Sequence, residues 1–505
     1  MKRLTTFIAA ILIACTPTAN PEDEKPGPDN PSTPQTPETP VTPPEPEPEP
    51  DGVCIDAPLV LELESAPVLG TAGSIVVYSS DGKEVDRIDL ADMATVNMRP
   101  DGTMIPKQQI TADSKYNTFM DALKSGSRFR AVHYTPLRIK GNSLIIKLHD
   151  GVLNFGGEYS VTVDAGVVQG HGGVASGEWG FKVKPKPSAA GTLSVKPDGS
   201  GDFCTVQGAL GYASSLGKDT AVTVEVGVGT YNEMLFLRDK NNVTIKGASR
   251  VGTVISYPNN ESWCSGSGGS RNTRPFAGAL VNTSGGRGLM LVENCNNLVI
   301  SDLTIENSFG EQKGQAEAVY FNSGNNTHRL TIENCRLLSW QDTFLCKGEV
   351  WVHNSLIAGH CDFIWGYPKV CLFEDCEIRA RAAGYIVQAR VPNATDKGFV
   401  FLNCNLTAED GVSNGKMYLA RSGGDSKVYD NVTFVGCTMS PVIAPQGWYS
   451  NPAPTPSSPT ATSGWKEYGS VDPSGKAITG HNALGRVLTA SEDEPFASRA
   501  AVLGW

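Results

Sequence analysis

Three polar side chains recur at one offset in a repeated segment of the chain. Gln315, Asp342 and Asp362 each lie seven residues after the small residue that ends a short repeated motif. If the repeats stack as parallel strands, equal offsets fall into one column with a spacing of about 4.8 Å. Two carboxyl groups at that spacing do not both ionise easily, so one of them is expected to have a raised pKa. The pair could then supply an acid together with a nucleophile or base.

Two reactions fit such a carboxyl pair. A glycoside hydrolase with its carboxyl groups about 5 Å apart cleaves a sugar chain with retention of configuration. An esterase instead attacks a carbonyl with one carboxylate, protonates the leaving alcohol with the other, and stabilises the oxyanion with amide donors. Gln315 and Gln341 are neutral amides beside the two aspartates. Their presence favours the esterase.

The repeated motif predicts the scaffold that brings these residues together. Each copy reads apolar residue, any residue, Asn/Asp/Gly, then Cys or Ser, with a base period near 20 residues and variable insertions. Short segments rich in Val, Ile and Phe at such a period are typical of a right-handed parallel β-helix, whose coils stack and carry loops at their corners. The cysteines of the motif are expected to be small turn residues and not disulfide partners. The six copies are 305–308, 332–335, 352–355, 373–376, 401–404 and 434–437.

The residues before the β-helix, which is predicted over 188–505, divide into three parts. Residues 1–15 pair a basic start with a short apolar run and resemble a lipoprotein signal peptide and lipobox, with Cys15 as the lipidated residue. Residues 16–52 hold many prolines and most of the formal net charge of −11, so we expect a disordered tether. Residues 53–187 alternate short apolar segments with polar turns and resemble a bacterial Ig-like β-sandwich. The fold class is therefore predicted to be all-β.

The leader and tether predict where the protein is found and what it contacts. We expect an outer-membrane lipoprotein of a Gram-negative bacterium, facing the periplasm or the cell surface and contacting the membrane through its N-terminal lipid. No Lys/Arg-rich stretch occurs, so a nucleic-acid partner is not expected. The spacing of His353, His360 and Cys361 matches no zinc motif, so no metal is assigned. We expect a monomer that works without a cofactor.

Motifs across residues 190–505 resemble those of the pectin methylesterase family, which are carbohydrate esterases built on a right-handed parallel β-helix. Gln341 begins a Gln-Asp-Thr segment, and Asp362 begins Asp-Phe-Ile-Trp-Gly. Both are similar to aspartate motifs of the family. The matching segments, in family order, are 198–203, 229–233, 315–319, 341–343, 362–366, 388–390 and 418–421.

The resemblance implies a reaction in which methyl esters of polygalacturonate are hydrolysed to pectate and methanol. Asp362 would be the nucleophile, and Asp342 would protonate the departing methanol and then act as a base. Gln341 and Gln315 would bind the oxyanion, and Arg421 would orient Asp362.

The chain departs from the family directly after Arg421. The family usually has Pro-Trp there, with the tryptophan stacked on a sugar ring, whereas this chain has Ser-Gly-Gly. Substrate binding is therefore expected from Gln388, Trp448, Trp365 and Tyr367. Two alternatives remain at this point: a β-helix hydrolase or lyase that cleaves the pectin chain, and a non-catalytic glycan-binding lipoprotein.

Overall fold

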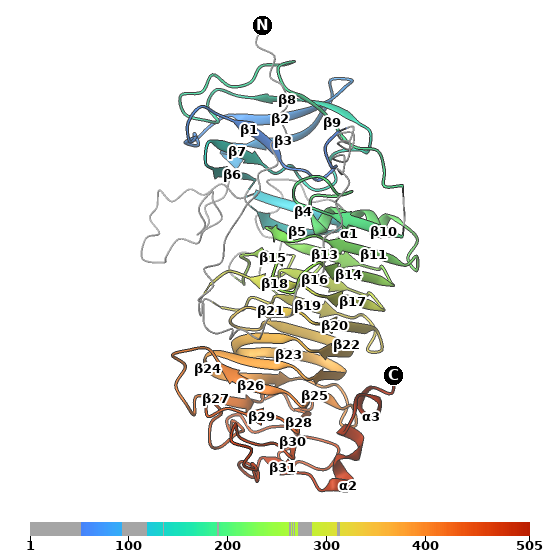
Figure 1. Ribbon diagram of the computed structural model, residues 1–505, viewed down its shortest axis with the longest axis vertical. Coiled ribbons are helices and arrows are strands. Elements are labelled where there is room, and N and C mark those ends of the chain that lie inside the picture. The colour runs from blue at the N-terminus through green and yellow to red at the C-terminus, as the bar shows by residue number, and fades with distance from the viewer. Residues whose placement is uncertain are drawn as a thin grey trace, which may run out of the picture.

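The N-terminal part of the protein stands at one end of a long stack of parallel coils (Figure 1). The predicted signal peptide, with Cys15, and nearly all of the predicted tether lie outside the described residues. No helix in the described part of the chain is both long and apolar enough to cross a bilayer. The computed structural model describes residues 52–92, 119–134, 136–188, 191–261, 264, 266, 268–270, 285–310 and 314–505.

Residues 53–187 contain antiparallel strands, as the alternating pattern predicts. In β1, Leu59 and Leu61 are buried while Val60 and Glu62 are exposed, which is the period of two that a half-buried strand requires. The sheets have the orders β1-β7-β6, β3-β2-β8-β9 and β4-β5. The Ig-like assignment stays a prediction. The elements are β1 (Leu59–Glu62), β2 (Ser74–Ser79), β3 (Glu84–Asp89), η1 (Leu90–Asp92), β4 (Phe119–Ser125), β5 (Arg128–Tyr134), β6 (Leu137–Lys140), β7 (Ser143–Ile146), β8 (Glu158–Val163) and β9 (Gly180–Lys182).

The rest of the described chain confirms the predicted parallel β-helix. Twenty-two strands form one sheet that winds around a core of Val, Ile, Leu and Phe side chains. The elements are β10 (Thr192–Val195), α1 (Val206–Ser215), β11 (Val222–Val226), β12 (Gly229–Tyr231), β13 (Leu235–Arg238), β14 (Val243–Gly247), β15 (Thr253–Tyr257), β16 (Met290–Glu293), β17 (Leu298–Ser301), β18 (Thr304–Asn307), β19 (Val319–Asn322), β20 (Arg329–Glu333), β21 (Arg336–Leu338), β22 (Phe344–His353), β23 (Leu356–Glu374), β24 (Glu377–Ala389), β25 (Gly398–Leu402), β26 (Asn405–Ala408), β27 (Met417–Ala420), β28 (Val432–Val435), β29 (Thr438–Met439), β30 (Trp465–Tyr468), β31 (Gly485–Val487), α2 (Ala490–Asp493), η3 (Glu494–Phe496) and α3 (Arg499–Leu503).

The strands stack as three parallel ladders. One follows β10, β11, β14, β17, β20, β22, β23, β25, β28, β30 and β31, and its outer face is covered by the C-terminal segment. The second follows β12, β15, β18, β21, β23, β24, β26 and β29. The third follows β13, β16, β19, β22, β23, β24 and β27. The long strands β22, β23 and β24 each belong to more than one ladder, so the middle coils are continuous across a corner.

The register of the first ladder confirms five of the six predicted repeats. The residue before each small residue has a left-handed backbone, with φ between 46° and 61°, which explains why Asn, Asp or Gly stands there. The cysteines that follow are buried, and each thiol donates to the carbonyl two residues earlier. None of the described cysteines forms a disulfide. The stacked apolar residues are Ile332, Val352, Phe373, Phe401 and Phe434.

The predicted repeat at 305–308 is wrong. Ile332 pairs with Ile300, not with Ile305, so the true copy is 300–303 and has Leu303 at the small-residue position. Ile305 belongs to the next strand of the same coil, β18. The two short segments have similar apolar patterns, and only the ladder distinguishes them.

The N-terminal part and the β-helix share a packed junction. Helix α1 packs against β4 of the hairpin β4–β5 and against β10, β11 and β13 of the first coils. Arg130 on β5 is fully buried and donates to the carbonyls of Leu235, Gly285, Gly286, Gly288 and Leu289. Because these carbonyls lie in β13 and in the segment before β16, one side chain of the hairpin fixes the backbone that leads into the β-helix core.

Candidate active site

Asp342 and Asp362 lie on neighbouring coils, as the sequence predicts. The residues before them, Gln341 and Cys361, form a parallel bridge, and the backbone N–H of Asp342 donates to the carbonyl of Cys361 at 3.1 Å. Both aspartates have a left-handed backbone, with φ of 66° and 47°. Such a conformation is costly for a residue other than glycine and is concentrated at functional sites. Both side chains are nevertheless buried, which gives the pair a low-dielectric setting.

The predicted column is displaced by one residue at its first member. Gln315 forms its bridge with Gln341 and not with Asp342. The displacement follows from the misplaced repeat, because the coil that ends at Gln315 is longer than the next one. The two glutamines therefore lie side by side on adjacent coils, next to the aspartate pair.

Asp362 is held by two side chains from the next coils. The Arg421 guanidinium forms a fork on the carboxylate, with Nε donating to Oδ1 at 2.7 Å and Nη2 donating to Oδ2. Gln388 Nε2 donates to Oδ2 at 2.9 Å. Arg421 follows β27, and Gln388 lies on β24 in the same ladder. This arrangement stabilises an ionised carboxylate and fixes its plane.

Asp342 has a different electrostatic setting. Among the residues that the structure describes, one cation contacts it directly, with Arg287 Nη2 donating to Oδ2 at 3.0 Å. Burial raises the pKa of Asp342 well above its usual range, the nearby Glu317 carboxylate adds to this rise, and Arg287 opposes it. Asp342 is therefore the protonated partner of the pair near neutrality, beside an ion-paired Asp362.

Sequence reasoning missed the arginine that joins these groups. Arg287 Nε donates to Glu317 at 3.0 Å, and Nη1 donates to Gln315 Oε1 at 2.8 Å and to Glu261 Oε2 at 2.9 Å. Glu317 is fully buried, and burial raises its pKa to about 7. One signal was present in the sequence: a glutamate at 317, inside the otherwise apolar segment 316–321.

The predicted substrate-binding aromatic residues lie in different places. Trp448 is 1% exposed, stacks on Trp465 at 5.3 Å, and donates to Glu467, so it belongs to the core and its expected contact with substrate is not supported. Trp365 is 5% exposed, and Tyr367 is partly buried. Both rings lie within 6 Å of the Arg390 guanidinium, which also donates to Gln388 Oε1 and to the Tyr367 hydroxyl. Trp365 and Tyr367 are thus tied to the Asp362 side of the site.

A cluster of tyrosines next to Arg421 was also missed. The rings of Tyr385, Tyr418 and Tyr449 are partly buried and contact one another at 4.9 to 5.8 Å between centroids. Arg421 lies over the Tyr385 ring at 4.9 Å. These residues come from β24, β27 and the following loop, so they are separated in sequence and meet only through stacking of the coils.

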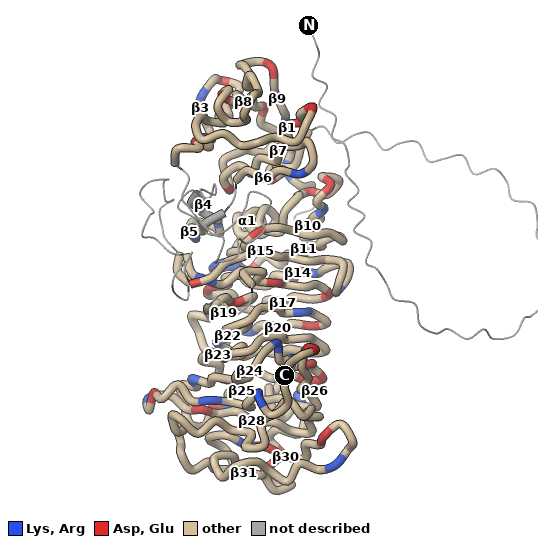
Figure 2. The backbone as a smooth tube through the Cα atoms, turned by 90° about the vertical axis from the view of Figure 1, so that its left-hand side faces the viewer, with Lys and Arg blue, Asp and Glu red and all other residues tan. Residues whose placement is uncertain are grey.

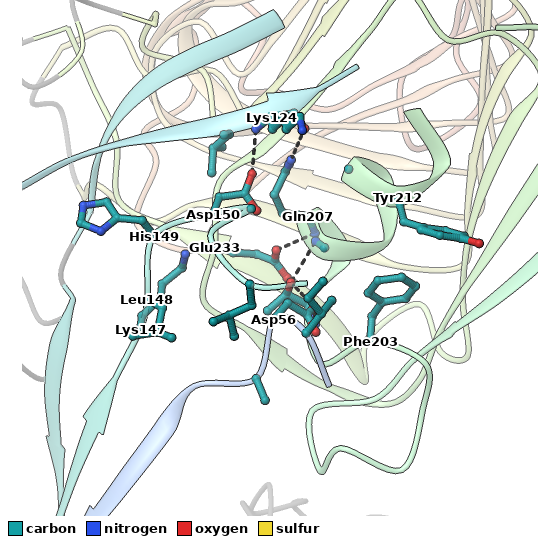
Figure 3. Close-up of a pocket in the computed structure, with 18 of the residues that line it drawn as sticks. Asp56, Lys124, Lys147, Leu148, His149, Asp150, Phe203, Gln207, Tyr212 and Glu233 are labelled. Atoms are coloured by element: carbon teal, nitrogen blue, oxygen red, sulfur yellow. Dashed lines mark hydrogen bonds between the residues drawn. The ribbon is translucent and has the colours of Figure 1, made fainter. Parts of the chain in front are cut away.

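A cavity of about 740 Å³ lies at the junction of the N-terminal part with the β-helix, away from the aspartate pair (Figure 3). Its carboxylates hold the start of α1. Glu233 accepts the backbone N–H groups of Val206 and Gln207 at 2.8 Å, and Asp56 accepts those of Cys204 and Thr205. Acceptors at a helix N-terminus satisfy free N–H groups there. Glu233, although part of a motif of the resemblance, is thus a structural residue here.

One group in the described residues has donor atoms close enough for a metal ion. Cys54, Asp56 and Cys204 bring their ligand atoms within 4.8 Å of one another. Both oxygens of Asp56 already accept hydrogen bonds, from the backbone N–H of Cys204 and from the backbone N–H and hydroxyl of Thr205, the N-cap of α1. The group belongs to the junction and contributes nothing to the aspartate pair.

Comparison with known proteins identifies the family. The pectinesterase family model matches residues 192–478. Pectinesterase 31 of Arabidopsis thaliana is 31% identical over 262 residues, which are 51% of this chain and 76% of the relative. Probable pectinesterase 56 of the same plant is 29% identical over 268 residues, which are 51% of this chain and 84% of that protein. The structure of pectin methylesterase from carrot is similar in fold, with a TM-score of 0.50 at 21% identity over 63% of this chain and 95% of the carrot chain. The chain therefore belongs to the pectinesterase family.

Proposed function

We propose that this protein hydrolyses the methyl esters of pectin, and that Asp362, Asp342, Gln341, Gln315 and Arg421 carry out the reaction. The observation that carries the proposal is the unequal setting of two adjacent aspartates. One is ion-paired with a guanidinium fork, and the other is buried with a raised pKa. A nucleophile and an acid are therefore available at the same pH from one residue type.

The reaction proceeds in two steps. Asp362 attacks the carbonyl carbon of the methyl ester, and the oxyanion accepts hydrogen bonds from the Gln341 and Gln315 amides. When the carbonyl re-forms, the bond to the methoxy oxygen breaks, and Asp342 donates its proton so that methanol leaves. Asp342, now ionised, takes a proton from water, which attacks the acyl-enzyme. The bond between the acyl carbon and the Asp362 oxygen breaks, so that Asp362 is a free carboxylate and Asp342 is protonated again. The galacturonic acid product departs and releases its remaining proton to solvent.

The distribution of charge along the coils fits a polysaccharide chain that is largely uncharged. Lys/Arg and Asp/Glu residues are interspersed along the described coils (Figure 2). Gln388, Trp365 and Tyr367 flank Asp362 on one side, and the cluster Tyr385, Tyr418 and Tyr449 flanks Arg421. We assign the sugar contact that the Ser-Gly-Gly segment after Arg421 lacks to the four partly buried tyrosine rings, because aromatic faces pack against sugar rings. Trp365 is buried and supports Arg390 from below.

Product analysis tests the function. The purified protein is expected to release methanol from highly esterified pectin without producing new reducing ends or unsaturated ends. New chain ends would instead support a hydrolase or lyase. Binding to pectin with no methanol would support a glycan-binding protein and would contradict the esterase.

We also propose the placement that the N-terminal sequence predicts: a lipid anchor at Cys15, a tether over 16–52 and an Ig-like module over 53–187 in a monomer at the outer membrane. In the Gram-negative setting, Cys15→Ser is expected to lose incorporation of labelled palmitate and to leave the membrane fraction. A variant that keeps its label would contradict the anchor. Protease treatment of intact cells distinguishes the cell surface from the periplasm, because only a surface-exposed protein is cleaved.

A further inference from the structure

Arg287 contacts both halves of the proposed machinery. Its Nη1 atom donates to Gln315, an oxyanion donor, and its Nη2 atom donates to Asp342, the acid. The arginine stands in the segment between β15 and β16, and its side chain is 7% exposed. No motif of the resemblance includes it.

We propose that Arg287 and its buried partner Glu317 form a positioning pair. The pair aligns Gln315 for binding the oxyanion and Asp342 for donating its proton. The inference rests on the proposed function, and it assigns a task to two residues that have no step of their own in the reaction.

The first task is the orientation of an amide. A side-chain amide has one oxygen acceptor and one nitrogen donor group. Because Arg287 Nη1 occupies the oxygen of Gln315 at 2.8 Å, the nitrogen of this amide is directed away from the arginine. Only the nitrogen can stabilise an oxyanion, so the guanidinium selects the catalytic orientation of Gln315.

The second task is to keep Asp342 protonated beside a cation. An arginine alone would favour the ionised form of Asp342, which would leave no acid. Glu317 accepts from Arg287 Nε with both oxygens, at 3.0 and 3.2 Å, and Glu261 accepts from Nη1. Two acidic side chains thus share one guanidinium, and Arg287 holds Asp342 in place while its positive charge is offset by Glu261 and by the ionised form of Glu317.

The charged groups that face Asp342 come from several coils. They are Glu317 and Arg287 in the network, Asp362 on β23 and Arg390 after β24. Glu317 and Asp362 raise the pKa of Asp342, whereas Arg287 and Arg390 lower it. Removal of the Glu317 charge is therefore expected to lower the pKa of Asp342.

The backbone around Arg287 is held by other residues. Arg130 donates to the carbonyls of Gly285, Gly286, Gly288 and Leu289. Asn259 Nδ2 donates to Gly286 at 3.1 Å and to Gly288 at 3.2 Å. Since the segment is anchored without the Arg287 side chain, that side chain can be changed with limited effect on the fold.

Two variants separate the two tasks. Arg287→Met releases both Gln315 and Asp342, and we expect kcat to fall about 100-fold with KM changed less than about 3-fold, because misalignment of a catalytic group costs about this much. Glu317→Gln keeps an acceptor for Arg287 Nε but removes the charge. Here the basic limb of the pH profile of kcat/KM, which reports loss of the Asp342 proton, is expected to move to lower pH by about one pH unit.

Glu293→Gln is the matched control. Glu293 is a buried glutamate on β16 that pairs with Arg238 at 2.6 Å, in the same β-helix but outside the network. Its loss is expected to change thermal stability without moving the pH profile. A merely structural role for Glu317 predicts the same result in both glutamate variants.

The outcomes are distinguishable. If the unmodified protein releases no methanol, the proposed function fails and the inference fails with it. Suppose that the unmodified protein is active, that Arg287→Met has the same kcat, and that the basic limb of Glu317→Gln lies at the same pH. The positioning role is then refuted and the function stands. If Arg287→Met does not fold, the position of the basic limb in the pH profile of Glu317→Gln decides the question. Circular dichroism then has to show that Glu317→Gln is folded.

Discussion

Asp362→Ala is expected to abolish methanol release, lowering kcat by roughly 10⁴-fold or more, because loss of a covalent nucleophile removes the acyl-enzyme route. The fold should persist. Asp362 lies in the middle of β23, whose ladder partners on both sides are formed by the backbone and do not depend on this side chain. Arg421, which loses its partner, is 30% exposed at its side chain and can be solvated.

The control for this variant is Asp375→Ala. Asp375 follows the same strand and has a similar left-handed backbone, with φ of 52° against 47° for Asp362. Any cost of placing alanine in that backbone is therefore common to both variants. Methanol release should stay near the unmodified value in Asp375→Ala, and circular dichroism should be unchanged in both. Equal activity in Asp362→Ala and the unmodified protein would refute the assigned nucleophile.

The sequence predicts the site correctly where two residues are one coil apart and no insertion lies between them. Gln341 and Cys361 are 20 residues apart and form a bridge, so Asp342 and Asp362 could be placed on neighbouring coils from their spacing. The turn chemistry was equally readable, because a left-handed residue before each corner favours Asn, Asp or Gly. Periodicity carries this information because each coil repeats the same backbone path.

The parts that were missed depend on insertions. Gln315 was placed one residue out of register because its coil is longer, and similar apolar segments at 300–303 and 305–308 could not be told apart. Arg287 lies 55 residues before Asp342, on an irregular segment that no period describes. Its contact with Asp342 arises because the segment leads into β16, which stacks through β19 on β22 in the third ladder.

The sequence also could not predict which aromatic side chains are buried and which are exposed. Trp448 and Tyr449 are adjacent in sequence, yet the first is buried on Trp465 and the second is partly buried beside Tyr385 and Tyr418. Composition favours both roles for a tryptophan, because its ring suits a core and a sugar groove alike. Only the direction of each side chain relative to the ladder decides between them.

Asp342→Asn is the second variant expected to have a large effect. Asparagine has the same size and can still accept from Arg287 Nη2, so the network should remain, but it has no proton to give and cannot act as a base. We expect kcat on pectin to fall by about 10²- to 10⁴-fold, the usual contribution of a general acid–base group. The Asp375→Asn variant, in the same backbone conformation but outside the site, should keep its activity.

The raised pKa of Asp342 predicts the direction in which activity changes with pH. Because burial and Glu317 raise the pKa of Asp342, its proton is present near neutrality and is lost as the pH rises through that pKa. Activity of the unmodified protein should therefore decline on the basic side, and this limb should be absent in Asp342→Asn. A variant that retains the limb would assign it to another group.

An aryl ester separates the two duties of Asp342. An acidic phenol leaves without help from a general acid, so Asp342→Asn should form the acyl-enzyme on Asp362 from an aryl ester at a rate close to that of the unmodified protein. Hydrolysis of that intermediate still needs a base, so turnover should stall after a burst of about one phenol per enzyme. A burst in Asp342→Asn that disappears when Asp362 is also replaced would place the nucleophile and the acid–base group on their assigned residues. Steady, burst-free release of phenol at the unmodified rate would contradict both assignments, because neither residue would then be limiting.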